Sequence, residues 1–333
     1  MNDNLFTDAL RQLLEARCTP QVVREVESTR SAGRLWQHIE ESGFADVLVP
    51  EAEGGAGASL SDAFSLFEMC GAHAVPVPLS ETMLARSLLS RAGAVQPPGS
   101  IAFGQAAGDG EARVTCPLVT GGQVADWVLV GRADECRLLD PAQAERSPGV
   151  FCLDATLSWP AAAWAAAAPV AATADAQVLQ ACACAALLAG AMMSVFERTL
   201  RYANERQQFG RPIGKFQAIQ HQLSVLSEQA FAARMAAQIG CHGEGAEPDR
   251  LRVAVAKART SEAALAVADL AHSIHGAIGF TSEFDLQLFT RRLHAWRHAA
   301  GAESYWHEVL GGEIVDRRDG LALDLLRDIT DWH

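Results

Sequence analysis

The residue types best suited to hold a charged ligand gather in one stretch, RYANERQQFGRPIGKFQAIQHQ, at residues 201–222. It combines one guanidinium, two amides and two aromatic rings: Arg206, Gln208, Gln217, Phe209 and Phe216. A guanidinium presents several donors in a planar fork, so it suits a phosphate or diphosphate group. A polar turn between two helices, with no chemical role, is the alternative explanation for the same residues.

The sequence on either side of this stretch predicts two long helices that position it. Apolar residues recur every three or four positions from Leu188 to Ala203, and the same spacing resumes at Phe216. Between the two patterns, residues 209–214 contain glycines and Pro212, which favour a turn over a helix interior. The candidate ligand-binding residues are therefore expected on an elbow between two helices.

The string ERQQFGRPIGKFQAIQH resembles the signature of the acyl-CoA dehydrogenase family, in which an R-x-x-F-G turn is followed by F-Q-x-x-Q or F-Q-x-x-H. The resemblance implies that Arg206 reaches the FAD pyrophosphate of a neighbouring subunit. It also implies that Gln208, Phe209, Phe216 and Gln217 lie along that flavin.

A second string, HSIHGAIGFTSE at residues 272–283, resembles the family's H-G-G-x-G-F-T segment. The resemblance implies that this backbone approaches the FAD closely, which glycines permit because they lack a Cβ atom. The implied cofactor contacts are His275, Gly276, Ala277 and Gly279. The sequence departs from the family pattern at Ser273, where glutamine is common, and at Ala277, where the second glycine stands. If the resemblance to the family is set aside, the same residues predict only the C-terminus of a helix.

The carboxylate expected to act as catalytic base is missing from its usual places. Dehydrogenation of an acyl-CoA needs a base that removes the α-proton while a hydride leaves the β-carbon. Counted along the resemblance, the usual glutamate position is Gly301, and the position used by a minority of the family is Gln180. The nearest carboxylate is Glu303. It is a candidate base if the local register shifts, and otherwise a helix N-terminal carboxylate stabilised by the helix dipole.

These departures resemble the non-catalytic subunit of the heteromeric acyl-CoA dehydrogenases with which bacteria process steroid side chains and other bulky acyl groups. The implied function is dehydrogenation of a bulky acyl-CoA at a flavin site shared with a second, base-carrying subunit, in a heterotetramer with two copies of each. An electron-transfer flavoprotein or a similar protein would accept the electrons. Two alternatives remain open: a homomeric dehydrogenase that uses Glu303, and a non-enzymatic scaffold subunit with a vestigial flavin site.

Changes in sequence pattern predict three domains, at residues 1–97, 98–172 and 173–333. The first carries short amphipathic helical stripes. The second carries short apolar runs separated by Gly, Asp and Pro, which predict a small antiparallel β domain with strands near residues 101–103, 114–116, 127–130, 137–139 and 150–153. The third is almost entirely helical, with helices expected at 175–207, 216–241, 247–275, 281–300 and 302–312. The predicted fold is mainly α with a small β domain, similar to that of acyl-CoA dehydrogenases. The threonine-containing, glycine-rich stretch with which that family covers the flavin is absent.

Composition limits the other functions. A formal net charge of −13 without blocks of like charge argues against a nucleic-acid surface. Eight scattered cysteines without C-x-x-C spacing favour buried thiols in a reducing compartment over a metal site. The N-terminus has no signal-peptide pattern, and no apolar run reaches membrane-spanning length without interruption. A soluble cytoplasmic protein without a metal is expected, and no G-x-S-x-G elbow supports a serine hydrolase.

Overall fold

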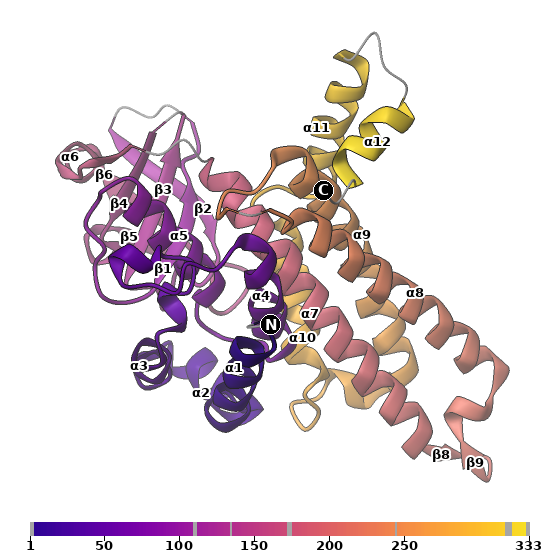
Figure 1. Ribbon diagram of the computed structural model, residues 1–333. Helices are drawn as coiled ribbons and strands as arrows, with labels where there is room; N and C mark the ends of the chain where they lie inside the picture. The colour runs from indigo at the N-terminus through magenta and orange to yellow at the C-terminus, as the bar shows by residue number, and fades with distance from the viewer. Residues whose placement is uncertain are drawn as a thin grey trace.

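The computed structural model describes residues 3–108, 112–133, 135–171, 175–243, 245–316 and 322–330. Three parts follow one another along the chain: an N-terminal group of helices, two small β-sheets, and a C-terminal bundle of long helices (Figure 1). The predicted fold class, mainly α with a small β domain, is confirmed. The predicted boundary between residues 172 and 173 lies outside the described residues.

The N-terminal part consists of α1 (Asp3–Arg17), α2 (Pro20–Thr29), α3 (Gly33–Ser42), α4 (Leu60–Ala72) and α5 (Leu79–Arg91), with 3₁₀ turns at Phe44–Asp46 and Glu51–Glu53. The start of α4 is determined by Ser59. Its hydroxyl accepts a hydrogen bond from the N–H of Asp62, whose carboxylate accepts one from the N–H of Ser59. This capping box satisfies amide groups that a helix start otherwise leaves unpaired.

The middle part holds two sheets with the strand orders β1-β3-β4-β7 and β2-β6-β5. The strands are β1 (Ile101–Gln105), β2 (Arg113–Val119), β3 (Trp127–Arg132), β4 (Glu135–Leu139), β5 (Glu145–Pro148), β6 (Ala155–Pro160) and β7 (Pro169–Val170), with a 3₁₀ turn at Pro141–Gln143 and the short helix α6 (Ala161–Ala166). The prediction of an antiparallel domain is wrong for one pair, because β1 runs parallel to β3. Between these two strands the chain passes through β2, which belongs to the other sheet.

One predicted strand, residues 150–153, is not a strand. These residues form bends and a turn, and Val150 is 87% exposed. The N–H of Gly149 donates to the carbonyl oxygen of Asp154 at 2.9 Å, and the N–H of Asp154 donates to that of Phe151 at 3.0 Å. These local hydrogen bonds close a loop, and pairing with the neighbouring strands begins only at β6.

The C-terminal part contains α7 (Ala176–Glu205), α8 (Gln217–Gly240), α9 (Arg250–His275), α10 (Leu286–His298), α11 (Glu303–Asp316) and α12 (Ala322–Thr330). The predicted long helices are confirmed, although α10 begins later than expected. The reason is that α9 is followed by a 3₁₀ turn, η5 (Gly276–Phe280), and a further turn before α10 starts. The sequence pattern had treated part of this connection as helix.

The helix α7 forms the centre of the bundle and packs against α4, α8, α9 and α10. By length and composition alone, α7 and the helical segment Arg250–Phe280 could each cross a membrane, although the sequence showed no uninterrupted apolar run of that length. Of the apolar window in α7, 89% is buried inside the protein, against 44% in the other segment. The place of α7 in the core therefore accounts for its apolar composition.

The helices α4 and α7 cross with their backbones in close contact. A Cβ atom at Gly71 would lie 2.1 Å from the carbonyl oxygen of Leu187, and one at Gly190 would lie 1.8 Å from that of Glu68. Only glycine permits so close an approach of two backbones. This pair of glycines fixes the distance between the N-terminal helices and the bundle.

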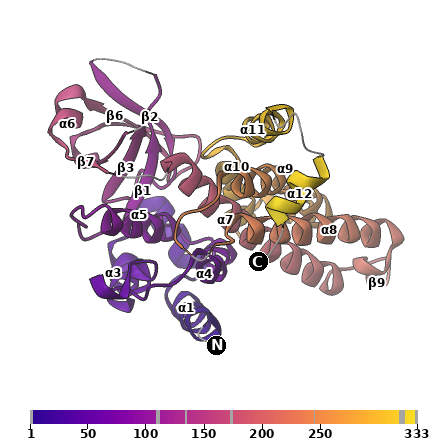
Figure 2. The ribbon, with the colours of Figure 1, turned by 45° about the horizontal axis from the view of Figure 1, so that its top comes forward.

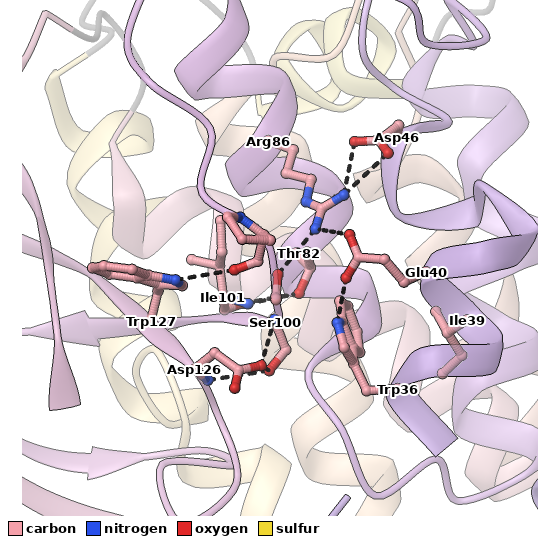
Figure 3. A network of polar contacts seen from close by, with 12 residues as sticks. Trp36, Ile39, Glu40, Asp46, Thr82, Arg86, Ser100, Ile101, Asp126 and Trp127 are labelled. Atoms are coloured by element: carbon pink, nitrogen blue, oxygen red, sulfur yellow. Dashed lines mark hydrogen bonds and ion pairs between the residues drawn. The ribbon is translucent and has the colours of Figure 1, made fainter. Parts of the chain in front are cut away.

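A polar network connects the N-terminal helices to the first strand (Figure 3). On α5, Arg86 donates to both carboxylate oxygens of Asp46 at 3.0 Å and to the carboxylate of Glu40. Four residues earlier on the same helix, Oγ1 of Thr82 accepts a hydrogen bond from the N–H of Ile101 at 2.9 Å. The Arg86 contacts hold α5 against α3 and the 3₁₀ turn that follows it, and the Thr82 contact holds the start of α5 next to β1.

Candidate functional site

Residues 206–217, from the end of α7 to the first residue of α8, form a projection that we call the arm. Two short strands, β8 (Gln207–Gln208) and β9 (Arg211–Pro212), make a hairpin with Phe209 and Gly210 at its tip. Both tip residues have positive φ, 52° and 79°, which is easy for glycine and uncommon for phenylalanine. In both views of the molecule the arm lies at the end of the bundle remote from the sheets (Figures 1 and 2).

The side chains of the arm that the sequence singled out are directed to the surface. Arg206, Gln208 and Gln217 are exposed, and no hydrogen bond or ion pair of their side chains is found within the described part of the chain. Phe209 is 91% exposed and touches the half-buried Phe216 ring edge-on, with 6.1 Å between the centroids. An unpaired guanidinium beside an exposed aromatic ring is a surface suited to a binding partner.

The second predicted cofactor segment lies at the same end of the bundle. The helix α9 ends at His275, whose carbonyl oxygen accepts a hydrogen bond from the Tyr202 hydroxyl at 3.3 Å. The Gln222 amide on α8 donates to the Ser273 hydroxyl on α9 at 3.2 Å. A small buried cluster joins α7, α8 and α9 at this point: Ala203, Leu223 and Ile274. The two sequence motifs therefore come together in space.

The imidazole of His275 is buried under the arm's base. It stacks on the Tyr202 ring at 4.4 Å between centroids, and its Nδ1 lies 2.7 Å from the carbonyl oxygen of Ala271. Burial lowers the pKa of His275, so the ring is neutral at physiological pH. Its Nε2 has no hydrogen-bond partner among the described residues, which leaves one polar atom available to a ligand.

The small residues after His275 differ in their surroundings. Gly276 and Ala277 are exposed, and nothing lies within 4 Å of the position that a Cβ atom would take at Gly276, where φ is 64°. Gly279 is buried, and a Cβ atom there would lie 3.1 Å from Nδ1 of His272 and 3.1 Å from Cβ of His275. Packing within the chain therefore accounts for Gly279, whereas Gly276 and Ala277 present backbone to the surface.

A cavity of about 210 Å³ lies where α5, the sheets, α7 and α10 meet, and none of the arm's residues lines it. Its wall is largely apolar and includes Val77, Leu79, Leu153, Leu187, Ala295 and Trp296. Its polar lining includes Glu27, Ser80, Glu81, Asp154, Arg291 and Arg292. The loop that sequence patterns had predicted as a strand, residues 150–153, forms part of this wall.

The carboxylate nearest the second predicted base position was missed by sequence reasoning. Gln180 is buried on α7, and its amide donates to Oε1 of Glu81 at 3.2 Å. Oε2 of Glu81 accepts a hydrogen bond from the N–H of Phe103 at 3.0 Å. Burial raises the pKa of Glu81 to about 8, so most of this carboxyl is protonated at neutral pH. The burial of Glu81 could have been inferred from the sequence of α5, because its apolar residues lie on every face of the helix, as they do in buried helices.

The first predicted base position is strained for any side chain in this backbone. Gly301 has a φ of 97°, and a Cβ atom there would lie 2.7 Å from Cδ1 of Tyr305. Its carbonyl oxygen accepts a hydrogen bond from Nζ of Lys257 at 2.9 Å, and Lys257 also donates to the carbonyl oxygen of Arg297 at 2.9 Å. Burial lowers the pKa of Lys257 to about 8. A buried amino group therefore holds the loop between α10 and α11 in place.

Glu303 begins α11 and forms an ion pair with Arg297. Burial acts to raise the pKa of the Glu303 carboxyl, but a hydrogen bond to its own backbone and the neighbouring Arg297 together lower it. Glu303 is ionised, is paired within its own chain, and does not line the cavity. It lies far from the arm, since α11 and the arm are at opposite ends of the bundle (Figure 1). Its role as a base stays a prediction.

The fold and the arm together define a class of protein. An N-terminal helical part, a small β part and a C-terminal bundle with a hairpin between its first two long helices make up the architecture of an acyl-CoA dehydrogenase. The sequence profile "Acyl-CoA dehydrogenase, N-terminal domain" matches residues 2–96, and "Acyl-CoA dehydrogenase, C-terminal domain" matches residues 178–312. The chain belongs to the acyl-CoA dehydrogenase family.

Individual relatives support this assignment. The chain is 31% identical over 293 residues to the acyl-CoA dehydrogenase IpdE2 of Mycolicibacterium smegmatis, a match that covers 87% of this chain and 91% of the relative. The ChsE4–ChsE5 complex from Mycobacterium tuberculosis has a similar fold, with a TM-score of 0.81 at 20% identity over 97% of this chain and 98% of that chain. A variant of the Tcur3481–Tcur3483 steroid ACAD gives a TM-score of 0.82 at 26% identity, over 96% and 99%. The FAD complex of PigA gives 0.74 at 16% identity, over 95% and 98%.

Proposed function

We propose that this chain is a subunit of an FAD-dependent acyl-CoA dehydrogenase that completes a flavin site on a second subunit and does not supply the catalytic base. The main observation that supports this proposal is the exposure of the arm. The Arg206 guanidinium and the Phe209 ring are exposed, have no polar or enclosing partner within the described residues, and lie remote from the cavity of their own chain. A second chain would cover such a surface and use its donors.

The side chains of the arm suit the chemistry of the proposed cofactor. Arg206 would bind the diphosphate, with the Gln208 and Gln217 amides as further donors. The rings of Phe209 and Phe216 would pack along the cofactor. The exposed backbone of Gly276 and Ala277, the imidazole of His275 and the turn at Gly279 would lie beside it. Bound FAD supplies the acceptor for the hydride that leaves the β-carbon of the substrate. The residues of this chain bind and orient the cofactor.

The lack of a carboxylate at the two base positions of the family, Gly301 and Gln180, supports the division of labour between two subunits. Gly301 has no side chain and a backbone conformation that disfavours one. The Gln180 amide has no lone-pair basicity comparable to a carboxylate and is engaged by Glu81. Proton abstraction is therefore assigned to a carboxylate of the partner subunit.

The names of the similar proteins support a bulky acyl-CoA, such as a steroid-derived one, as the substrate, because one of them is a steroid ACAD. They also support two unlike subunits, since another is the ChsE4–ChsE5 complex. We assign a heterotetramer with two copies of each subunit and an electron-transfer flavoprotein or similar acceptor. The cysteines that the structure describes are unpaired, and all but Cys152 are buried, which suits the reducing cytoplasm.

The visible absorption spectrum tests this proposal. The chain is purified alone and together with an acyl-CoA dehydrogenase encoded beside it. Flavin is expected only in the mixture, where a bulky acyl-CoA should bleach its absorption. Stoichiometric flavin in the lone chain, bleached by an acyl-CoA, would contradict a shared site.

Two other functions give different results in the same preparation. A homomeric enzyme that uses Glu303 would lose flavin reduction on Glu303→Gln, whereas the proposed subunit would keep it, because Glu303 is paired with Arg297. A scaffold subunit would carry no flavin with any partner. The ion pair makes the first alternative the less favoured, since the carboxylate already has a partner within its own chain.

A further inference from the structure

Two polar side chains join α8 to α9 beside the base of the arm. The Gln222 amide on α8 donates to the Ser273 hydroxyl on α9 at 3.2 Å. Each of the two residues is followed by an apolar one, Leu223 and Ile274, and these pack together with Ala203 in one small buried cluster. The packing of the apolar neighbours therefore determines where Gln222 and Ser273 meet.

The amide of Gln222 has hydrogen-bonding capacity that its own chain does not use. A glutamine amide carries two N–H donors and a carbonyl oxygen. One donor binds Ser273, and no other hydrogen bond of this amide is found within the described part of the chain. Gln222 is half-buried and Ser273 is exposed, so one donor and one acceptor remain at a surface that a ligand can reach.

This pair lies next to the exposed backbone at the end of α9. Ser273 precedes Gly276 by three residues, a spacing that places neighbours on one face of a helix, and both residues are exposed. Nothing lies within 4 Å of the position that a Cβ atom would take at Gly276. The carbonyl oxygen of His275 is held by the Tyr202 hydroxyl at 3.3 Å, which fixes this backbone against α7. A group bound over Gly276 would therefore lie within one helical turn of the Gln222–Ser273 pair.

The pair also coincides with a departure from the family's pattern. Glutamine is common at position 273 of that pattern, and this chain has serine there, which is too short to place an amide over the end of α9. Gln222 lies one residue beyond the string that resembles the family's signature, and its amide is within hydrogen-bonding distance of the Ser273 hydroxyl. The amide that is missing from α9 is therefore supplied by α8 at the same place.

We propose that Gln222 is a cofactor-binding residue whose amide, oriented by Ser273, takes the place of the glutamine that the family carries at position 273. The proposal rests on the flavin-completing function and adds to it a contact that neither sequence motif contains. A neutral amide with one free donor and one free acceptor suits the hydroxyl groups of FAD, which both donate and accept, whereas the diphosphate is left to the Arg206 guanidinium.

Titration of the assembled complex with FAD, followed by flavin fluorescence, tests this role. Gln222→Ala should weaken FAD binding about tenfold, as expected for the loss of two hydrogen bonds. Adding Ser273→Gln to that variant returns an amide to the same place and should restore the affinity to within about twofold of the native value. Gln238→Ala removes an amide from the other end of α8 and should leave the affinity unchanged. Thermal unfolding of the lone chain shows whether each variant folds, and Gln222→Met replaces Gln222→Ala if the latter does not.

A contact that only joins α8 to α9 gives a different result. Gln222→Ala and Ser273→Ala remove the same hydrogen bond between the helices, so a structural role predicts equal losses of FAD affinity. The proposed role predicts a loss of only about twofold for Ser273→Ala, because the Gln222 amide is still present. Equal losses, or failure of Ser273→Gln to restore binding, would overturn the proposal.

Arg206→Ala in the same titration separates this proposal from the function on which it rests. If Arg206→Ala weakens FAD binding and Gln222→Ala does not, the shared flavin site stands and the role of Gln222 is overturned. If neither variant changes the affinity, or if the complex takes up no FAD, both proposals are overturned.

Discussion

The two ends of α7 are built in opposite ways. Near its start, Gln180 is buried and hydrogen-bonded to the buried Glu81, and the adjoining cavity is enclosed by residues from all three parts of the chain. At its other end, Arg206 and Phe209 are exposed, and no described part of the same chain covers them. The first region is therefore complete within a single chain, whereas the second depends on what binds to it. Substitutions at the two ends should therefore affect different measurements.

Among substitutions at the enclosed end, the largest loss of stability is expected when a carboxylate is placed at Gly301, the usual base position of the family. Gly301→Glu should destabilise the chain by about 4 kcal/mol, because positive φ strains a non-glycine residue and the new side chain overpacks against Tyr305. Thermal unfolding measures the effect. Gly312→Ala is the control, because its Cβ meets nothing within 4 Å. A Gly301→Glu chain as stable as the native one would refute the backbone argument.

Because the Glu81 carboxyl is buried, the free energy of unfolding of the chain should depend on pH. Burial raises its pKa from 4.5 to about 8, so the folded chain holds the proton more tightly than the unfolded chain. Stability is unaffected below pH 4.5 and falls as the pH rises from 4.5 to 8. Glu81→Gln should therefore be about 3 kcal/mol more stable than the native chain at pH 7 and equal to it near pH 4.5. Urea unfolding at both pH values measures this. A difference that does not change with pH would contradict it.

At the open end, Arg206→Ala should affect cofactor binding and leave the lone chain's stability unchanged. Loss of hydrogen bonds between a guanidinium and a diphosphate is expected to cost about 2 kcal/mol, or about thirtyfold in the affinity of the assembled complex for FAD. Flavin fluorescence during titration measures that affinity. Arg201→Ala, an exposed arginine earlier on α7, serves as the control. Unchanged FAD affinity would remove the arm from the flavin site.

The smallest effect on stability is expected at the tip of the arm. Phe209→Gly should change the free energy of unfolding of the lone chain by no more than about 0.5 kcal/mol, because the ring is 91% exposed and glycine accepts the positive φ. The same variant should weaken assembly with the partner subunit, which analytical ultracentrifugation measures. A large loss of stability in the lone chain would mean that the arm packs within its own chain.

The sequence predicted the features that depend on neighbours along the chain. The spacing of apolar residues located the long helices, and glycines with Pro212 located the elbow between α7 and α8. Pairing between distant segments was not predictable in this way. The parallel pairing of β1 with β3 depends on where β2 goes. The turn at residues 150–153 is held in part by hydrogen bonds that the distant residues Gly121 and Gln123 donate to it and to the adjacent Asp154.

The same distinction applies to the candidate site, where some residues were predictable from the sequence and others were not. The resemblance to a family located the arm and the segment after His275, and the structure places both at one end of the bundle. Glu81 was missed because its burial comes from contacts with Gln180 and Phe103, which lie on other elements. The strain at Gly301 was also hidden, since a glycine in the sequence carries no information on its φ.

The crossing of α4 and α7 at Gly71 and Gly190 restricts how this chain can diverge among its relatives. The two backbones already touch, so neither glycine can be exchanged without moving a helix that carries part of the cavity wall. Descendants that accept larger or smaller molecules should therefore change the side chains around the cavity and retain both glycines. A change of ligand is therefore expected to alter the volume of side chains around the cavity and to leave the crossing of the two helices as it is.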